Sequence, residues 1–371
     1  MAAKAPGTGN GLGGNDGADG RAAGGAAGAR IRVLPATAEA AAARGRTARP
    51  HGRGLALLKA AALGGLALTL AAACSAGTAL VGAHPSAPSA GLGSVAPKVT
   101  STPSPQTCDP AASSKAPTAS AANGADVAAI KRRGYLTVGV AADQYLTGYL
   151  ASGGAEEGFD IDLAYAVAKS LFGAGYQSKV RFVAISTDKR IPDLQSHQVD
   201  LVIDTMTLTC DRLTKVDFSA VYYEASQKLL VESGSHYASL ADLGGRKVCA
   251  QTGSTSISLI QAAASKPIAY QVTDVSDCLV LLQQNQVSAI STDDTILAGL
   301  AKQDPNLSVV GQALEPEPYG VAMPLGETDL EEYVNGVLAQ YESSGGWAAS
   351  YNHWLAGSLG PANPPVARYS D

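Results

Sequence analysis

The sequence is poor in aromatic residues and in histidine. Of its 371 residues, 5% are Phe, Trp or Tyr, and five are His. It contains no metal-ligand spacing, no phosphate-binding glycine loop and no nucleophile elbow. The formal net charge of −5 is modest and does not indicate a nucleic-acid partner. These absences leave no basis for assigning a metal, a nucleotide or a covalent catalytic group, so we expect no cofactor.

The first part of the chain is typical of an export signal followed by a tether. Residues 1–53 lack apolar periodicity and are rich in Gly, Ala and Arg, which predicts a disordered extension. Arginines gather from Arg44 to Arg53, and residues 54–74 follow with a short apolar run and small residues before Cys74, as in a signal segment. Residues 75–123 are rich in Ser, Pro, Ala and Thr, which predicts a flexible tether.

Two interpretations of Cys74 stay open. A cysteine directly after small residues resembles a lipobox, in which the thiol is acylated and becomes the mature N-terminus. The alternative is an uncleaved anchor, because residues 60–83 carry no charge and are long enough to span a bilayer. The Ala- and Gly-rich run is only weakly apolar, which favours lipidation. We therefore expect the folded part to be lipid-anchored at the extracellular face of the cytoplasmic membrane.

From residue 124 onward, strand-like and helix-like segments alternate. Such alternation predicts open α/β sheets with right-handed crossovers, which bind ligands beyond the carboxyl ends of their strands. One amphipathic helix is marked by apolar residues four apart, from Phe159 to Leu171. The other expected helices are 125–133, 190–198, 255–264, 275–284, 294–301, 330–343 and 347–355. The expected strands are 135–140, 180–184, 199–203, 247–251, 268–272 and 287–291.

The segment 199–219 carries the most informative pattern. It begins with the alternation of a strand and then presents three hydroxyls at alternate positions, Thr205, Thr207 and Thr209, followed by Arg212. Hydroxyls beside a guanidinium can form a binding site for a carboxylate, because the paired N–H groups of Arg can donate to both carboxylate oxygens. The alternative is a threonine-rich edge strand with a solvated arginine.

Seven further pieces accompany that segment in a fixed order. They are GYLTVGV (134–140), GFDIDLAYAVA (158–168), KRIPDLQ (189–195), VDFSAVYY (216–223), GST (253–255), STDDTILAG (291–299) and YGVAMP (319–324). Together they resemble the extracellular solute-binding proteins that capture polar amino acids, of the glutamate/glutamine type, for ABC transporters. The piece TMTLTCDR and the paired cysteines are most similar to the actinobacterial lipoprotein branch of that family.

The resemblance implies a two-lobed, periplasmic-binding-protein-like (type II) α/β clamshell with two hinge strands, in which a few residues absorb the rotation. The implied boundaries are 124–221 and 322–357 for lobe 1, 227–316 for lobe 2, 222–226 and 317–321 for the hinges, and 358–371 for a tail. It also implies a monomeric binding protein, not an enzyme, that delivers a small amino acid to an ABC permease. Two alternatives remain, a lipid-anchored sensor that signals to a membrane receptor and an exported cyclohexadienyl dehydratase-like enzyme. The enzyme would need a general acid, and we find none suited among the expected cleft residues.

An α-amino acid requires a partner for its carboxylate and another for its ammonium group. We expect Arg212 to bind the carboxylate with help from Thr207 and Thr205, and the backbone N–H groups of Gly253, Ser254 and Thr255 to point at the ligand. The alternative for this triplet is ordinary N-capping by Ser254 or Thr255. In the family the aspartate at the position of Asp293 holds the ammonium group; the alternative is that Asp293 or Asp294 only caps a helix. We expect Asp294 to be the cap.

The side-chain end of the site decides which amino acid binds. Arg190 matches an arginine that receptors for acidic amino acids place there, which implies glutamate or aspartate as the ligand. The alternative is a solvated arginine at a helix start. Further candidates are Gln251, Thr292, Asp143 and Tyr145, the last as a lid over the apolar stem of the ligand, a role that Tyr149 could also fill.

The remaining cysteines are expected to form two disulfides. Cys249 lies on a strand of lobe 2 and Cys278 on the following αβ unit, and a bond between them is plausible in an oxidising compartment. With Cys74 acylated, Cys108 and Cys210 remain, and we expect them to bond and to pin the tether near the cleft. The alternative for Cys210 is a buried free thiol.

Overall fold

A computed structural model describes residues 108–370 of the chain. The predicted extension, the signal segment with Cys74 and the tether up to residue 107 lie outside the described residues, as does Asp371. Within residues 108–370, no helix has both the length and the apolar character that a membrane span requires.

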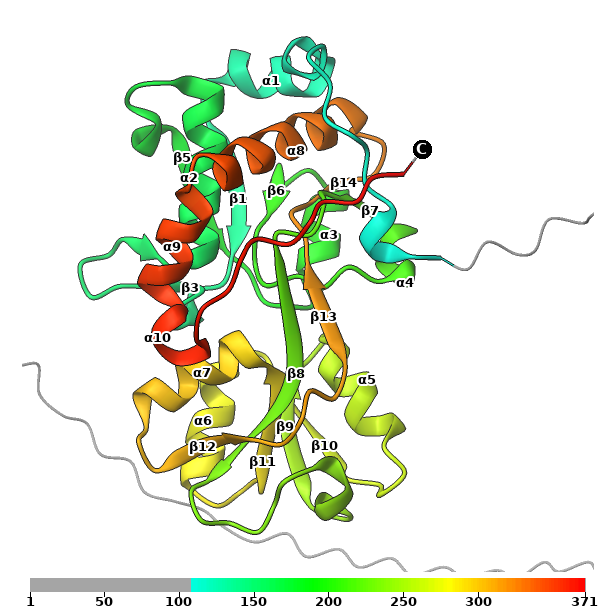
Figure 1. Ribbon diagram of the computed structural model, residues 1–371, viewed down its shortest axis with the longest axis vertical. Coiled ribbons are helices and arrows are strands. Elements are labelled where there is room, and N and C mark those ends of the chain that lie inside the picture. Colours follow the sequence, from blue (N-terminus) through cyan, green and yellow to red (C-terminus); the bar gives the residue numbers. More distant parts are fainter. Residues whose placement is uncertain (1–107, 371) are drawn as a thin grey trace, which may run out of the picture. The chain divides into compact units, whose positions relative to one another are not determined.

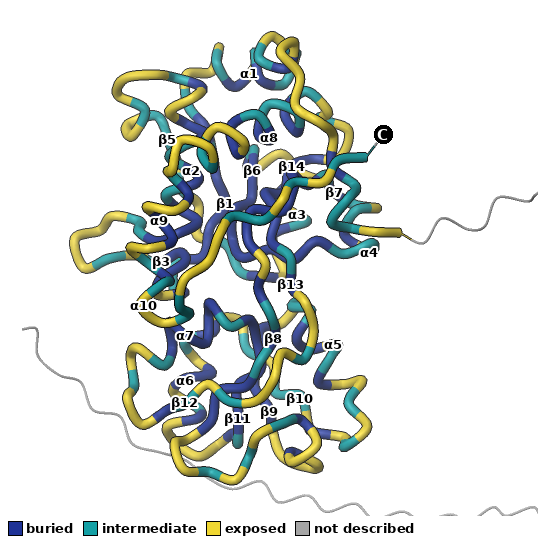
Figure 2. Tube along the Cα trace, in the orientation of Figure 1, coloured by how far each residue is buried: buried dark blue, intermediate teal, exposed yellow. Residues whose placement is uncertain are grey.

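The first of two sheets has five strands, in the order β5-β1-β6-β14-β7. Strand β1 pairs in parallel with β5 and β6, whereas β14 is antiparallel to β6 and β7. The central strands β1 and β6 are buried along most of their length (Figure 2). The strands are β1 (Leu136–Val140), β5 (Val180–Ala184), β6 (Leu201–Val202), β7 (Val216–Phe218) and β14 (Ala322–Pro324). We call this sheet, with the helices packed on it, lobe 1.

The helices of lobe 1 form because their apolar residues recur on one face. In α2 the residues Phe159, Leu163, Val167 and Leu171 are all buried, and the helix ends before Gly173, whose positive φ of 66° terminates it. The aromatic rings of α9 pack on the same core, with Trp347 stacked on Tyr351. The helices are α1 (Ala125–Arg133), α2 (Phe159–Phe172), α3 (Arg190–Gln195), α4 (Cys210–Leu213), α8 (Thr328–Ser343), α9 (Gly346–Trp354) and α10 (Ala356–Leu359).

The second sheet, of lobe 2, has six strands, in the order β10-β9-β11-β8-β12, with β13 pairing β8. Strand β9 is parallel to β10 and β11, and β8 is antiparallel to all its partners. The strands are β8 (Tyr223–Glu232), β9 (Lys247–Gln251), β10 (Ile268–Val272), β11 (Ala289–Asp293), β12 (Leu307–Val310) and β13 (Pro316–Tyr319). The helices are α5 (Thr255–Ala262), α6 (Val275–Gln283) and α7 (Asp294–Gln303).

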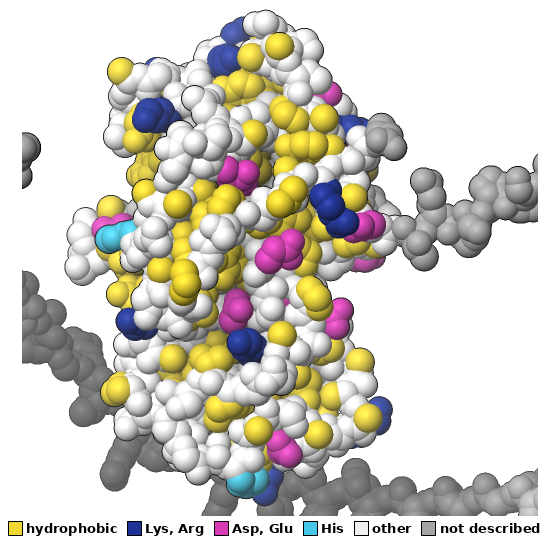
Figure 3. Space-filling model, in the orientation of Figure 1, with side chains coloured by type: hydrophobic (Ala, Val, Ile, Leu, Met, Phe, Trp, Pro, Cys, Tyr) yellow, Lys and Arg dark blue, Asp and Glu magenta, His cyan; other side chains and the backbone are white. Residues whose placement is uncertain are grey.

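Smaller elements complete the described part of the chain. A three-stranded sheet is made of β2 (Asp143–Gln144), β3 (Gly148–Leu150) and β4 (Glu156–Glu157). Four 3-10 turns are η1 (Pro110–Ala112), η2 (Ala121–Asn123), η3 (Tyr176–Lys179) and η4 (Leu240–Leu243). On the face shown in Figure 3, charged side chains of both signs are scattered among apolar and neutral ones, as the modest net charge leads one to expect.

The chain passes between the lobes on two antiparallel strands, β8 and β13 (Figure 1). Their register pairs Tyr223 with Tyr319 and Ser226 with Pro316. Ladder hydrogen bonds hold the two crossings together, so they can bend as a unit while each lobe keeps its own core. The predicted two-lobed type II clamshell with two hinge strands is confirmed.

Two predicted strands differ from the observed ones where the site begins. The strand expected at 199–203 is only Leu201–Val202, and the strand expected at 287–291 is shifted to Ala289–Asp293. In the first case the backbone leaves the ladder because Thr205 takes a positive φ of 43°, which a β-branched residue rarely adopts. The helix expected to reach residue 198 ends at Gln195.

The expectation of a flexible tether up to residue 123 is wrong for residues 108–123, which pack on lobe 1. The disulfide Cys108–Cys210 holds their first residue. The Ser114 hydroxyl donates to Glu331 Oε1 over 3.0 Å, and Asn335 Nδ2 donates to the Ser114 hydroxyl over 2.6 Å. Side chains of α8 thus satisfy polar groups that composition alone assigns to solvent. The end of the chain joins this contact, since the Ser370 N–H donates to the Ser114 carbonyl.

Candidate ligand-binding site

A cavity of about 20 Å³ lies between the two lobes. It has room for about one water molecule, which is well below the volume of an ordinary ligand site. The cavity lies where β6, β9 and β11 end, as expected for α/β sheets. Lobe 1 contributes Thr187, Arg190, Thr205, Thr207 and Arg212. Lobe 2 contributes Gln251, Ser254, Thr255, Ser256, Thr292, Asp293 and Ile296.

Arg212 is a cation of lobe 1 whose side chain reaches lobe 2. It lies in α4, whose first turn is capped by the Thr209 hydroxyl, and its side chain is buried. Its Nη1 donates to the Thr207 carbonyl over 2.7 Å, and its Nη2 donates across the cleft to the Gly253 carbonyl over 3.4 Å. Burial, followed by the like charge of Arg190, lowers the pKa of Arg212 to about 9, so the guanidinium still carries its charge at neutral pH. The alternative of a solvated arginine on an edge strand is wrong.

Asp293 is the anion that lobe 2 presents to the cavity. It is the last residue of β11 and 5% exposed, and its Oδ2 accepts a hydrogen bond from the Tyr319 hydroxyl over 2.7 Å. Burial, and then the neighbouring carboxylate of Glu317, raise the pKa of Asp293 well above its usual value. The expectation that Asp294 is the cap of α7 is wrong, because Asp293 holds the N-cap position without a side-chain capping bond. Its carboxylate is turned to the tyrosine instead.

The turn before α5 brings the backbones of the two lobes close together. Gly253 has a φ of 81°, and a Cβ atom there would lie 2.9 Å from the Cα of Asp188 in lobe 1, so only glycine fits. Ser254 holds the N-cap position, but its N–H and its hydroxyl both donate to the Gln251 carbonyl. The first amides of α5, from Thr255 and Ser256, are therefore the donors that remain for a ligand. The alternative of N-capping by the Ser254 side chain is not borne out, because this N-cap residue makes no side-chain capping bond.

Arg190 is buried, so the alternative of a solvated helix-start arginine is wrong. Its Nε donates to the Thr187 carbonyl over 3.1 Å and its Nη1 to the Asp204 carbonyl over 2.8 Å. Its Nε also lies 3.9 Å from Oδ2 of the Asp204 carboxylate. These interactions engage Nε and Nη1, and they place the Asp204 carboxyl group beside the guanidinium.

A second carboxylate supports this arrangement from α2. Asp160 Oδ2 accepts from the Thr205 N–H over 2.8 Å, and its Oδ1 accepts from the Tyr222 hydroxyl over 2.9 Å. The first bond holds the left-handed backbone of Thr205, which would otherwise be strained. Burial raises the pKa of Asp160 to about 6 and that of Asp204 to about 7. The lining residues Thr205 and Arg190 are therefore each held by a carboxylate that titrates close to neutral pH.

Three of the residues expected at the site lie outside the cavity lining. Asp143 instead accepts a hydrogen bond from the Ser276 N–H of α6, over 3.0 Å, and so connects the lobes. Tyr145 is 36% exposed and packs edge-on against Tyr149, because the turn between β2 and β3 leaves it at the surface. Gly253 contributes only its carbonyl to Arg212. The other expected residues, Gln251 and Thr292 included, line the cavity.

Sequence reasoning missed several residues at the site. Glu317 on the hinge strand β13 is 2% exposed and accepts from the Thr255 hydroxyl over 2.9 Å, while burial raises its pKa. Ser256 is 1% exposed, and its hydroxyl lines the cavity without a partner among the described residues. Asp204 was not among the residues expected at the site. The signals present were a glutamate between two prolines in the hinge and a second serine after Gly-Ser-Thr.

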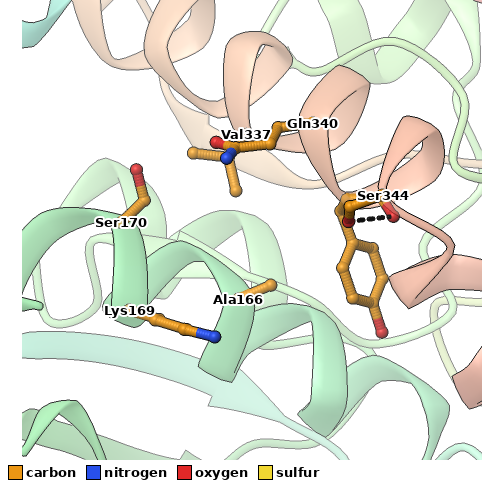
Figure 4. A pocket seen from close by; sticks show the side chains of 7 residues that line it. Ala166, Lys169, Ser170, Val337, Gln340 and Ser344 are labelled. Carbon is orange, nitrogen blue, oxygen red and sulfur yellow. Dashed lines mark hydrogen bonds between the residues drawn. The ribbon is translucent and has the colours of Figure 1, made fainter. Parts of the chain in front are cut away.

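A larger depression lies elsewhere, between α2 and α8 (Figure 4). Its volume is about 280 Å³, and Lys169 is its one charged lining residue. It offers no carboxylate to an ammonium group and contains none of the residues expected at the site. The described residues also contain no group of three side chains able to hold a metal ion.

The chain is similar to known amino-acid-binding proteins. The profile of the bacterial extracellular solute-binding proteins, family 3, matches residues 136–357. The ABC transporter glutamine-binding protein GlnH of Bacillus subtilis is 37% identical over 231 residues, which cover 62% of this chain and 84% of that protein. A glutamine-binding protein of Geobacillus stearothermophilus is 39% identical over 194 residues, or 52% of this chain and 73% of that one.

Solved structures agree with this assignment. An ancestral arginine-binding protein bound to glutamine superposes with a TM-score of 0.57 at 36% identity, covering 60% of this chain and 98% of its own. The profile match spans both lobes and both hinge strands of the structure. The chain therefore belongs to the bacterial extracellular solute-binding proteins, family 3.

Proposed function

We propose that the cavity binds one polar amino acid as a zwitterion. In this proposal Arg212 of lobe 1 binds the carboxylate and Asp293 of lobe 2 binds the ammonium group. The observation that carries the proposal is that a buried guanidinium and a buried carboxyl group from different lobes line one small cavity. Buried charges are unfavourable unless they are compensated, so a ligand with both charges on one carbon suits the site.

The first turn of α5 supports the same orientation of the ligand. The amides of Thr255 and Ser256 are free of helical partners, and a helix N-terminus favours an anion. The Ser256 hydroxyl is buried in the lining without a partner. Since buried polar groups are normally hydrogen-bonded, a ligand carboxylate near Arg212 would satisfy this group too.

For the side chain of the ligand we propose an uncharged amide, with glutamine as the first candidate. The expectation of glutamate or aspartate rested on Arg190 as a free cation, whereas the Asp204 carboxylate lies 3.9 Å from that guanidinium. A compensated arginine can still donate a hydrogen bond to an amide oxygen. The names of the two similar glutamine-binding proteins support this choice. Glutamate and aspartate are the alternative.

Delivery is proposed to follow closure of the lobes around the ligand. Hydrogen bonds already join the lobes, from Arg212 to Gly253 and from the Ser276 N–H to Asp143. We propose that the closed form is presented to an ABC permease, because GlnH is named as an ABC transporter protein. A lipid anchor at Cys74 and a monomeric state are parts of the same proposal.

A thermal-shift screen of the twenty amino acids tests the function. A ligand that binds only the folded state stabilises it by about 4.1 kcal/mol at a concentration of roughly 1,000 times Kd. We expect glutamine to give the largest rise in Tm, and the Arg212→Ala variant to show no rise. A screen in which no amino acid changes Tm contradicts the proposal. To test the alternative of a cyclohexadienyl dehydratase-like enzyme, the protein is incubated with prephenate or arogenate, and we expect no turnover.

A further inference from the structure

Asp204 is a buried carboxylate that the binding scheme above does not use. Its side chain is 1% exposed and does not line the cavity. It lies behind Arg190, which does line the cavity, with 3.9 Å between Oδ2 and Nε. The Asp204 carbonyl also accepts from Arg190 Nη1 over 2.8 Å. Among the charged lining residues, Arg190 is thus the one that forms an ion pair with the Asp204 carboxylate.

The other charges around Asp204 come from four elements. Asp160 on α2 and Asp143 on β2 are the anions that face it, and Arg190 on α3 and Arg212 on α4 are the cations. One neutral group also bonds to the Asp204 side chain, since Nε2 of Gln144 donates to its Oδ1 over 3.4 Å. Arg190 is the cation whose charge Asp204 meets most directly, because burial keeps water from screening the pair.

We propose that Asp204 is a specificity-determining residue that sets the charge of the ligand side chain through Arg190. With Asp204 ionised, the guanidinium is compensated, and its Nη2 has no hydrogen-bond partner within residues 108–370 and can donate to the oxygen of an amide. A carboxylate at the same place meets the same donor, but it gains little from a guanidinium whose charge Asp204 already compensates. The inference rests on the proposed amino-acid site and adds the selection of glutamine over glutamate.

Removing the charge of Asp204 should therefore change the ratio of the affinities for glutamate and glutamine, and not only the two affinities themselves. In the Asp204→Asn variant Arg190 has no compensating carboxylate, so glutamate gains relative to glutamine. One unit charge within a buried site corresponds to roughly a tenfold change or more in that ratio. The poles of the ligand are the same in both amino acids, so effects at Arg212 and Asp293 cancel in the ratio.

A cycle of four proteins tests the proposal by calorimetric titration with glutamine and glutamate. The proteins are wild type, Asp204→Asn, Arg190→Gln and the double variant, at about pH 8, above the value of about 7 to which burial raises the pKa of Asp204. We expect the glutamate-to-glutamine affinity ratio to rise roughly tenfold in Asp204→Asn and to stay unchanged when the same substitution is made in Arg190→Gln. A purely structural role of Asp204 would weaken both ligands together, and an unchanged ratio overturns the proposal. The proposal is also overturned if Asp204→Asn raises the glutamate-to-glutamine affinity ratio equally in the Arg190→Gln background.

Wild-type protein provides the test if Asp204→Asn does not fold. Lowering the pH from about 8 to about 6 protonates Asp204, so the ratio should rise in wild type and stay flat in Arg190→Gln. Asp160 titrates in this range too, at about pH 6, and its charge also acts on Arg190, although its oxygens are bonded to Thr205 and Tyr222. A flat ratio in wild type overturns the inference alone. Wild type that binds neither amino acid overturns the proposed function itself.

Discussion

Replacing Arg212 by Ala or by Lys measures what the guanidinium fork contributes to binding. A ligand carboxylate held by the fork gains two charge-assisted hydrogen bonds, each worth about 1.5–3 kcal/mol in a buried site. Arg212→Ala should therefore lose about 3–6 kcal/mol, which corresponds to roughly a 10²–10⁴-fold loss of affinity. Arg212→Lys keeps the charge but offers a single point of contact, so we expect about half of that free energy to be lost.

Calorimetric titration with the best amino acid of the screen gives the affinities, and urea unfolding gives the stability of each variant. Arg212→Ala also removes the bond to the Thr207 carbonyl and leaves Glu317 without its nearest cation, so some loss of stability is expected. Arg212→Lys is the matched control, because it retains the charge. Wild-type affinity in a folded Arg212→Ala protein would refute the assignment of this site.

Three further predictions concern the frame around the site. Replacing Cys108 and Cys210 by serine removes a bond that closes a loop spanning 102 residues. The chain-entropy model gives a fall of about 4.7 kcal/mol in the free energy of unfolding, measured in urea. A fall near zero contradicts a native disulfide. The pKa of Asp204 is raised from 3.8 to about 7 on folding, so its contribution to stability is complete below about pH 4 and is lost as the pH rises through 7. Asp204→Asn should make the unfolding free energy depend less on pH over that range. An unchanged slope against pH contradicts a raised pKa of Asp204. Asp143→Ala removes the contact with the Ser276 N–H between the lobes, so affinity should fall by about 0.5–2 kcal/mol, as for the loss of a helix cap; an unchanged Kd shows that the contact does not favour closure.

Elements bounded by clear local signals were predictable from the sequence. Helix α1 ends before Gly134, which has a φ of 84°, and strands β5, β9 and β10 have the predicted limits. Their patterns repeat at the periods of a helix or a strand and stop at residues that cannot continue them. Strand β11 was misplaced by two residues, because pairing with β8 extends it through Asp293.

The two disulfides were also predicted correctly. The pairs Cys108–Cys210 and Cys249–Cys278 are both formed in the structure. Residues 108–123, by contrast, have the composition of a tether but are held by Glu331 and Asn335, more than two hundred residues away. No local pattern reports such a contact, so composition alone gave the wrong result there.

The lining of the cavity was predicted better than its charge balance. The family resemblance placed Arg212, Asp293 and Arg190 at one cleft, and the structure has all three in the lining. It gave no sign that Arg190 is paired with Asp204, because that pairing depends on a buried contact between α3 and the end of β6. Tyr145 was expected at the ligand and lies at the surface, because aromatic character does not reveal the direction of a side chain in a short hairpin.

The central claim is that the two poles of one zwitterion are bound by opposite lobes. Calorimetric titration with glutamine, N-acetylglutamine and glutamine α-amide tests it most directly, because each analogue removes the charge of one pole and leaves the side chain intact. We expect glutamine to bind and each analogue to lose roughly 100-fold or more in affinity, as the removal of a buried charge pair implies. An analogue that binds as tightly as glutamine contradicts the claim.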